Sequence, residues 1–107
     1  MKEQDTVLIV DDEKVIRDGC SLILKPEGYQ VATAENGKEA LDILATQPVN
    51  VVLCDLKMPV MGALEVLEEA GARYPDIPVV IMTAFGSMET AIAAIRAGAY
   101  IQHDRLG

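Results

Sequence analysis

The stretch 50–62, NVVLCDLKMPVMG, constrains the fold more than any other part of this 107-residue chain. It begins with a run that is apolar at every position, Val51–Cys54, which predicts a strand buried on both faces of a parallel sheet. Pro59 cannot continue a strand ladder and disfavours helix at Met58, so the chain turns there. Asp55 is thereby expected at the carboxyl end of a central strand, which is where open α/β sheets bind their ligands.

Further aliphatic runs alternate with segments in which apolar residues recur at helical spacing. We predict strands over 7–10, 29–34, 51–54 and 79–82, and a fifth that begins at 99–101. We predict helices over 12–25, from Asn36 to Pro48, over 61–73, and from Ser87 to Gly98. This alternation indicates a doubly wound parallel sheet with right-handed crossovers and with helices on both faces.

The helical periodicity also predicts which side chains face the sheet. In the first helix the expected inward residues are Val15, Ile16, Cys20, Ile23 and Leu24, and in the third they are Leu64, Leu67 and Ala70. Asn36 stands three residues before Glu39, a spacing typical of a helix that begins with a capping box. No CxxC motif occurs, so both cysteines, Cys20 and Cys54, are expected to be buried and reduced.

The charge of the chain limits its partners, and its length and first apolar run indicate a single domain in the cytoplasm. A net charge of −8 argues against direct binding to nucleic acid or to an anionic membrane, and basic residues do not cluster. The first apolar run is too short for a signal-peptide core or a membrane span, so we expect a cytoplasmic protein. The length fits one domain over residues 1–107.

Polar residues follow three of the predicted strands, namely Asp11 and Asp12, then Asp55, then Thr83. Parallel strands end at one edge of a sheet, and two carboxylates about 4 Å apart repel by ~4 kcal/mol at an effective dielectric constant near 20. A cation would offset this repulsion, and oxygen ligands with room for water suit Mg²⁺. Taken singly, the two adjacent aspartates fit a helix N-terminus and Thr83 fits an ordinary strand end. Together they predict a Mg²⁺ site that leaves one carboxylate as a nucleophile for an aspartyl phosphate.

Here the sequence resembles the receiver domain of bacterial two-component response regulators. The resemblance rests on VLIVDDE, VNVVLCDLKMPVMG and IPVVIMTAFGSMETAIAAIRAGAY, and it extends from Val7 to Tyr100. Within the family, the segment TAFGSMETA is most similar to receivers of nitrogen-regulation-type transcriptional activators. The resemblance implies a flavodoxin-like strand order 2-1-3-4-5 and a domain that regulates transcription when phosphorylated, without acting as an enzyme on other molecules.

The resemblance also implies roles for individual residues. Asp55 would accept a phosphoryl group from a sensor histidine kinase, Thr83 would be the switch hydroxyl, and Tyr100 the switch aromatic. Mg²⁺ would be bound by Asp12, Asp55 and the backbone carbonyl of Lys57, with Asp11 acting partly through water.

The sequence departs from the family pattern in two places. An Asp-Gly pair usually follows the proline of the third-strand motif, whereas this chain has Met61-Gly62. After about residue 100 the family has a Lys-Pro pair and a fifth helix. Here an ungapped alignment puts Arg105 at the lysine position and a gapped one puts His103 there. We therefore expect a domain that is truncated or altered after Tyr100 and lacks its C-terminal helix.

Two other functions remain as alternatives. Without a fifth helix, four aliphatic side chains on the first and third strands would lose cover worth about 6–12 kcal/mol, which predicts self-association as a homodimer. An impaired receiver could then act through assembly alone. A Mg²⁺-dependent phosphatase with an aspartate nucleophile is more remote, because its DxDx[TV] motif is not matched by Leu56-Lys57 after Asp55.

Overall fold

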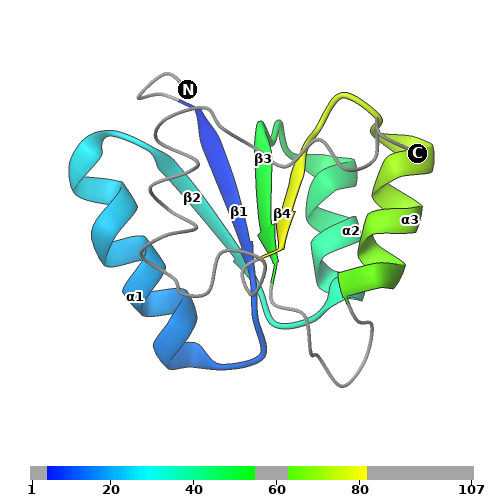
Figure 1. Cartoon of the computed structure of the whole chain (residues 1–107). Coiled ribbons are helices and arrows are strands. Elements are labelled where there is room, and N and C mark those ends of the chain that lie inside the picture. Colours follow the sequence, from blue (N-terminus) through cyan, green and yellow to red (C-terminus); the bar gives the residue numbers. More distant parts are fainter. Residues whose placement is uncertain (1–4, 55–62, 82–107) are drawn as a thin grey trace.

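The computed structural model describes residues 5–54 and 63–81, which form a parallel sheet and its connecting helices. The strands are β1 (Thr6–Val10), β2 (Gln30–Ala34), β3 (Val51–Cys54) and β4 (Val79–Ile81). The helices are α1 (Lys14–Leu24), the 3₁₀ turn η1 (Lys25–Glu27), α2 (Gly37–Thr46) and α3 (Ala63–Arg73). The sheet order β2-β1-β3-β4 (Figure 1) confirms the doubly wound arrangement for these strands. The predicted fifth strand and the helix from Ser87 to Gly98 lie outside the described residues.

The sheet separates two apolar layers, with α1 on one face and α2 and α3 on the other (Figure 1). Alternate residues of each strand enter opposite layers, as the strand period of two requires. In β1, for example, Val7 and Ile9 pack with α1, whereas Leu8 and Val10 pack on the other side. Both cysteines are buried as predicted, one in each layer, so the sheet lies between them.

Helix α1 is shorter than the predicted helix, and all but one of the residues predicted to face inward pack in the core, namely Ile16, Cys20, Ile23 and Leu24. It runs only to Leu24. The 3₁₀ turn η1 follows and contains Pro26, and Gly28 ends this turn with a left-handed φ of 96°. Cys20 and Leu24 are fully buried, but Val15 is 77% exposed, so its predicted inward position is wrong. Successive helical residues point about 100° apart, and the buried face of α1 leaves Val15 on the outer side.

Helix α2 begins at the predicted cap, and the described part of α3 contains one of its predicted core residues. The side chain of Asn36 accepts a hydrogen bond of 2.9 Å from the backbone N–H of Glu39. The carboxylate of Glu39 in turn accepts one of 2.9 Å from the N–H of Glu35, one residue before the cap, which completes a variant of the capping box. In α3, Ala70 is buried as predicted and Val66 is buried without having been predicted. The structure does not describe Met61-Gly62, nor the side chains of Leu64 and Leu67.

The α1-facing side chains of the central strands are fully buried. Val7 and Ile9 of β1 and Val51 and Leu53 of β3 are all 0% exposed. The expectation that these side chains lose their cover is therefore wrong, and the apolar patch proposed to drive a homodimer is not formed by them. Self-association as such stays a prediction, which sedimentation can test.

Among residues 5–54 and 63–81, no helix is both long enough and apolar enough to cross a membrane.

Candidate metal and phosphorylation site

Strands β1 and β3 end at the same level of the sheet. Their register pairs Val7 with Val51 and Val10 with Cys54, the last residue of each strand. In Figure 1 the carboxyl ends of both strands lie at the lower side of the view, beside the connection that leads into α1. The connection after β1 therefore borders the end of the central strand, as the sequence predicted.

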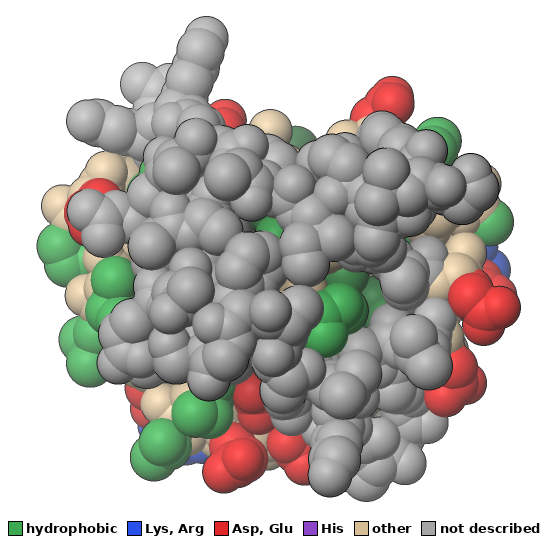
Figure 2. Space-filling view, viewed as in Figure 1, with side chains coloured by type: hydrophobic (Ala, Val, Ile, Leu, Met, Phe, Trp, Pro, Cys, Tyr) green, Lys and Arg blue, Asp and Glu red, His purple; other side chains and the backbone are tan. Residues whose placement is uncertain are grey.

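Three acidic residues gather in that connection. One carboxylate oxygen from each of Asp11, Asp12 and Glu13 lies within 4.8 Å of the other two. Asp11 is only 2% exposed, whereas Asp12 and Glu13 are exposed. Figure 2 shows acidic side chains (red) at the lower edge of the same view. The cluster thus has a buried carboxylate on its inner side and two carboxylates that face solvent.

The structure argues against the simpler interpretation of these aspartates as helix caps. The N-cap of α1 is Glu13, which has an extended backbone conformation. Among the described residues, none caps α1 through its side chain. Instead, Oδ1 of Asp11 accepts a hydrogen bond of 2.8 Å from the N–H of Glu13. One Asp11 oxygen is thereby engaged in shaping the loop that precedes α1.

The donor set of the cluster fits a hard divalent cation. All of its side-chain donors are carboxylate oxygens, which Mg²⁺ prefers, and the exposure of Asp12 and Glu13 leaves room for the waters that Mg²⁺ keeps. Carboxylates this close repel one another at any effective dielectric constant found in proteins, and a cation removes that cost. The residues present therefore fit a magnesium ion.

The remaining predicted site residues lie outside the described residues. These are Asp55, Lys57, Thr83 and Tyr100, together with His103 and Arg105 of the tail. The described strand β3 stops at Cys54, directly before Asp55 in the sequence. Their roles therefore stay predictions.

Sequence reasoning overlooked two residues of this region. Glu13 joins the acidic cluster, and the uninterrupted run Asp11-Asp12-Glu13 at a strand end was the available signal. Arg17 contacts the same loop, since its Nη1 donates a hydrogen bond of 2.8 Å to the backbone carbonyl of Asp11. The spacing of four residues between Glu13 and Arg17 places both on one side of a helix start, but it does not reveal the carbonyl as the acceptor.

An open groove of about 530 Å³ lies elsewhere, between α1 and β2, the edge strand of the described sheet. The described residues that line it are Asp18, Ser21, Leu22, Lys25, Pro26 and Thr33. None of these residues belongs to the acidic cluster, so the groove is separate from the candidate cation site.

Comparisons with known proteins agree with the geometry. Residues 7–102 match the family described as response regulator receiver domain. An NtrX-like response regulator of Rickettsia bellii is 46% identical, over 88% of this chain and 20% of that protein. The transcriptional regulatory protein ZraR of Klebsiella oxytoca is 40% identical, over 91% of this chain and 22% of that protein. The chain thus spans about a fifth of the length of these relatives.

A solved structure has a similar fold. The response regulator protein TrrA of Thermotoga maritima, in complex with Mg²⁺ and BeF, superimposes with a TM-score of 0.70 and 36% identity. The match covers 73% of this chain and 68% of that one. The parallel sheet, the acidic connection after β1 and the family match over residues 7–102 lead to one conclusion: the chain belongs to the receiver domain family of two-component response regulators.

Proposed function

We propose that this domain is a phosphorylation switch in which Asp55 accepts a phosphoryl group from a sensor histidine kinase. The observation that carries the proposal is the acidic cluster Asp11-Asp12-Glu13 beside the end of β3, because the sequence continues from Cys54 with Asp55. The output is a changed surface that controls transcription through the rest of a longer regulator. The relatives named as transcriptional and response regulators support this output.

We assign the magnesium ion to Asp11, Asp12, Asp55 and the backbone carbonyl of Lys57. When bound, Mg²⁺ neutralises negative charge on the oxygens of a phosphoryl group. The buried carboxylate of Asp11 and the exposed carboxylate of Asp12 support the assignment, because together they supply fixed oxygen donors and access to water. The complex of TrrA with Mg²⁺ and BeF, a fluoride analogue of a phosphoryl group, also supports it.

The proposed transfer needs only two reacting groups, the Asp55 carboxylate and the phosphohistidine of the kinase. A carboxylate oxygen of Asp55 attacks the phosphorus atom of the kinase phosphohistidine, so that a P–O bond forms and the P–N bond breaks. The leaving imidazole nitrogen keeps the electron pair. Water later hydrolyses the acyl phosphate, which releases inorganic phosphate and restores the Asp55 carboxylate. The Thr83 hydroxyl donates a hydrogen bond to a phosphoryl oxygen, and Tyr100 responds as the switch aromatic.

The test is phosphorylation by acetyl phosphate in the presence of Mg²⁺, followed by intact-protein mass spectrometry. We expect the wild type to gain one phosphoryl group and Asp55→Asn to gain none. Asp42→Asn, which changes an exposed aspartate of α2, is the matched control and should react like the wild type. Equal modification of the wild type and Asp55→Asn would refute the assignment. Catalytic turnover of a phosphomonoester would instead favour the phosphatase alternative.

A further inference from the structure

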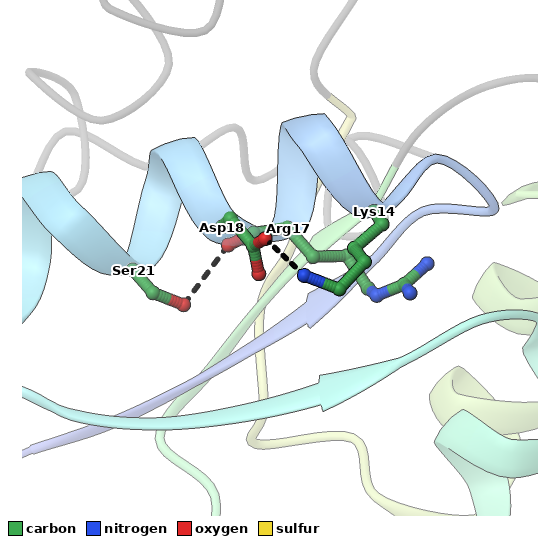
Figure 3. Close-up of polar contacts among 4 residues, drawn as sticks. All are labelled: Lys14, Arg17, Asp18 and Ser21. Carbon is green, nitrogen blue, oxygen red and sulfur yellow. Dashed lines mark hydrogen bonds and ion pairs between the residues drawn. The ribbon is translucent and has the colours of Figure 1, made fainter.

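Arg17 contacts the loop that carries the acidic cluster, although it contributes no ligand atom to it. Its Nη1 donates a hydrogen bond of 2.8 Å to the backbone carbonyl of Asp11. Figure 3 shows the Arg17 side chain running back along α1 toward the start of the helix, away from Ser21. The neighbouring cation Lys14 instead pairs with Asp18 at 2.6 Å. Lys14 and Arg17, which lie one turn apart on α1, therefore have different partners.

The carbonyl that Arg17 binds belongs to the peptide group that joins Asp11 to Asp12. This carbonyl and the N–H of Asp12 lie in one rigid plane, so fixing the carbonyl fixes the direction in which Asp12 continues. Asp11 is also held by two other bonds. Its N–H donates to the carbonyl of Ala34 at 3.1 Å, and its Oδ1 accepts from the N–H of Glu13 at 2.8 Å. The Arg17 bond connects α1 to the peptide between the two aspartates.

From this geometry we infer that Arg17 is a positioning residue for the cation site: it holds the Asp11–Asp12 peptide so that both carboxylates face the ion together. A guanidinium donor suits this task, because charge-assisted hydrogen bonds are about twice as strong as neutral ones. The inference rests on the proposed function, since it concerns the same magnesium site.

Charge and positioning predict opposite effects when Arg17 is replaced. Arg17 carries a positive charge, which repels an incoming Mg²⁺ ion, so removal of that charge alone would tighten Mg²⁺ binding. Loss of the hydrogen bond would instead let the peptide rotate and would weaken binding. The direction of the change in Mg²⁺ affinity therefore separates the two roles.

The experiment is a titration of the apo protein with Mg²⁺, followed by the NMR shifts of the Asp11, Asp12 and Glu13 amides. The variants are Arg17→Met, which keeps an apolar stem, and Arg17→Lys, which keeps the charge. We expect Arg17→Met to weaken Mg²⁺ binding about ten- to a hundredfold, as is typical for partners that orient metal ligands. Arg17→Lys should recover part of this loss, because an ammonium can still donate to the carbonyl but lacks the reach of guanidinium.

Lys14→Met is the matched control. Lys14 lies one turn of α1 before Arg17, pairs with Asp18 and is 79% exposed, so the variant removes a nearby positive charge without touching the Asp11 carbonyl. Its Mg²⁺ affinity should be equal to or higher than that of the wild type. Urea unfolding without Mg²⁺ establishes that each variant is fully folded at the temperature of the titration, so that a change in affinity does not reflect a loss of folded protein.

Each outcome decides the inference. Wild-type or tighter Mg²⁺ binding by folded Arg17→Met would overturn it, as would an equal weakening in Lys14→Met. Should Arg17→Met fail to fold, Arg17→Gln, which loses the charge and is too short to reach the carbonyl as Arg17 does, takes its place, and wild-type or tighter Mg²⁺ binding by folded Arg17→Gln would overturn the inference. If the wild type itself shows no shift at Asp11 or Asp12, the proposed magnesium site fails, a result distinct from failure of the Arg17 role alone.

Discussion

Thr6 and Asn50 exchange two hydrogen bonds where β1 and β3 begin. The N–H of Thr6 donates to Oδ1 of Asn50 at 2.8 Å, and the N–H of Asn50 donates to the carbonyl of Thr6 at 2.9 Å. The pair fixes the register at one end of two adjacent parallel strands. Because the strands then proceed in step, Val10 and Cys54 are paired at the other end, where the acidic cluster follows. A contact at the amino edge of the sheet thus helps to align the functional edge.

Replacement of Asn50 should therefore lower stability. We expect Asn50→Ala to reduce the free energy of unfolding by about 0.5–1.5 kcal/mol, because the N–H of Thr6 loses its side-chain acceptor. Asn50→Asp keeps an acceptor oxygen and should lose less. Urea denaturation measures both. Equal losses for the two variants would show that the acceptor oxygen is not the stabilising group.

The acidic cluster predicts a modest, side-chain-dependent Mg²⁺ affinity. Asp12→Ala should weaken Mg²⁺ binding about tenfold or more, which corresponds to at least ~1.4 kcal/mol, because it removes a carboxylate ligand. Asp42→Ala, which changes an exposed aspartate of α2, should bind like the wild type. Calorimetry or amide shifts would follow the titration. No response of the wild type to millimolar Mg²⁺ would contradict the site.

Two leucines of α1 provide a test of how the helix packs. Leu24 is fully buried, whereas Leu22 is 75% exposed. Leu24→Ala should cost about 2–5 kcal/mol of unfolding free energy, because it leaves a cavity under α1. Leu22→Ala should change stability by no more than about 0.5 kcal/mol. Similar losses from both variants, measured by urea denaturation, would show that α1 packs on a different face.

Two glycines should respond in opposite directions to alanine. Gly71 lies within α3, and a Cβ added there meets nothing within 4 Å. Gly71→Ala should stabilise the domain by about 0.4–1 kcal/mol, because it restricts the unfolded chain. Gly28 has a φ of 96°, so Gly28→Ala should destabilise by about 1–2 kcal/mol. Thermal unfolding would reveal the opposite shifts, and shifts of one sign would contradict the expectation.

The predicted departure from the family pattern after Tyr100 leads us to expect a weak response to phosphorylation. A charge-assisted hydrogen bond of the missing lysine is worth about 1.5–3 kcal/mol. Its loss should bias the two-state switch by about ten- to a hundredfold, so the Thr83 and Tyr100 shifts on adding acetyl phosphate should be small. Arg105→Lys should enlarge them if the ungapped alignment holds, and His103→Lys if the gapped one holds. Full shifts in the wild type would mean that Arg105 or His103 already takes the lysine role.

The sequence was most informative where a segment leaves few choices. An unbroken apolar run such as Val51–Cys54 has no polar face, so it requires cover on both sides and predicts a central parallel strand. The start of α2 was equally well determined, because the Asn36 cap bonds to a backbone group only three residues away. Both predictions depend only on the residue types within one short segment, and the structure confirms both.

Tertiary structure decided what depends on the angle at which elements meet. The spacing in α1 made Val15 and Ile16 equally good core residues, and only the placement of α1 on the sheet buries one side and exposes Val15. The burial of Asp11 and the approach of Glu13 depend likewise on the path of the connection between β1 and α1. The bond from Arg17 is made to a backbone carbonyl, a group that every residue carries. The sequence by itself therefore determined which segments form the sheet and where its acidic edge lies, while the three-dimensional packing alone selected the groups that shape that edge.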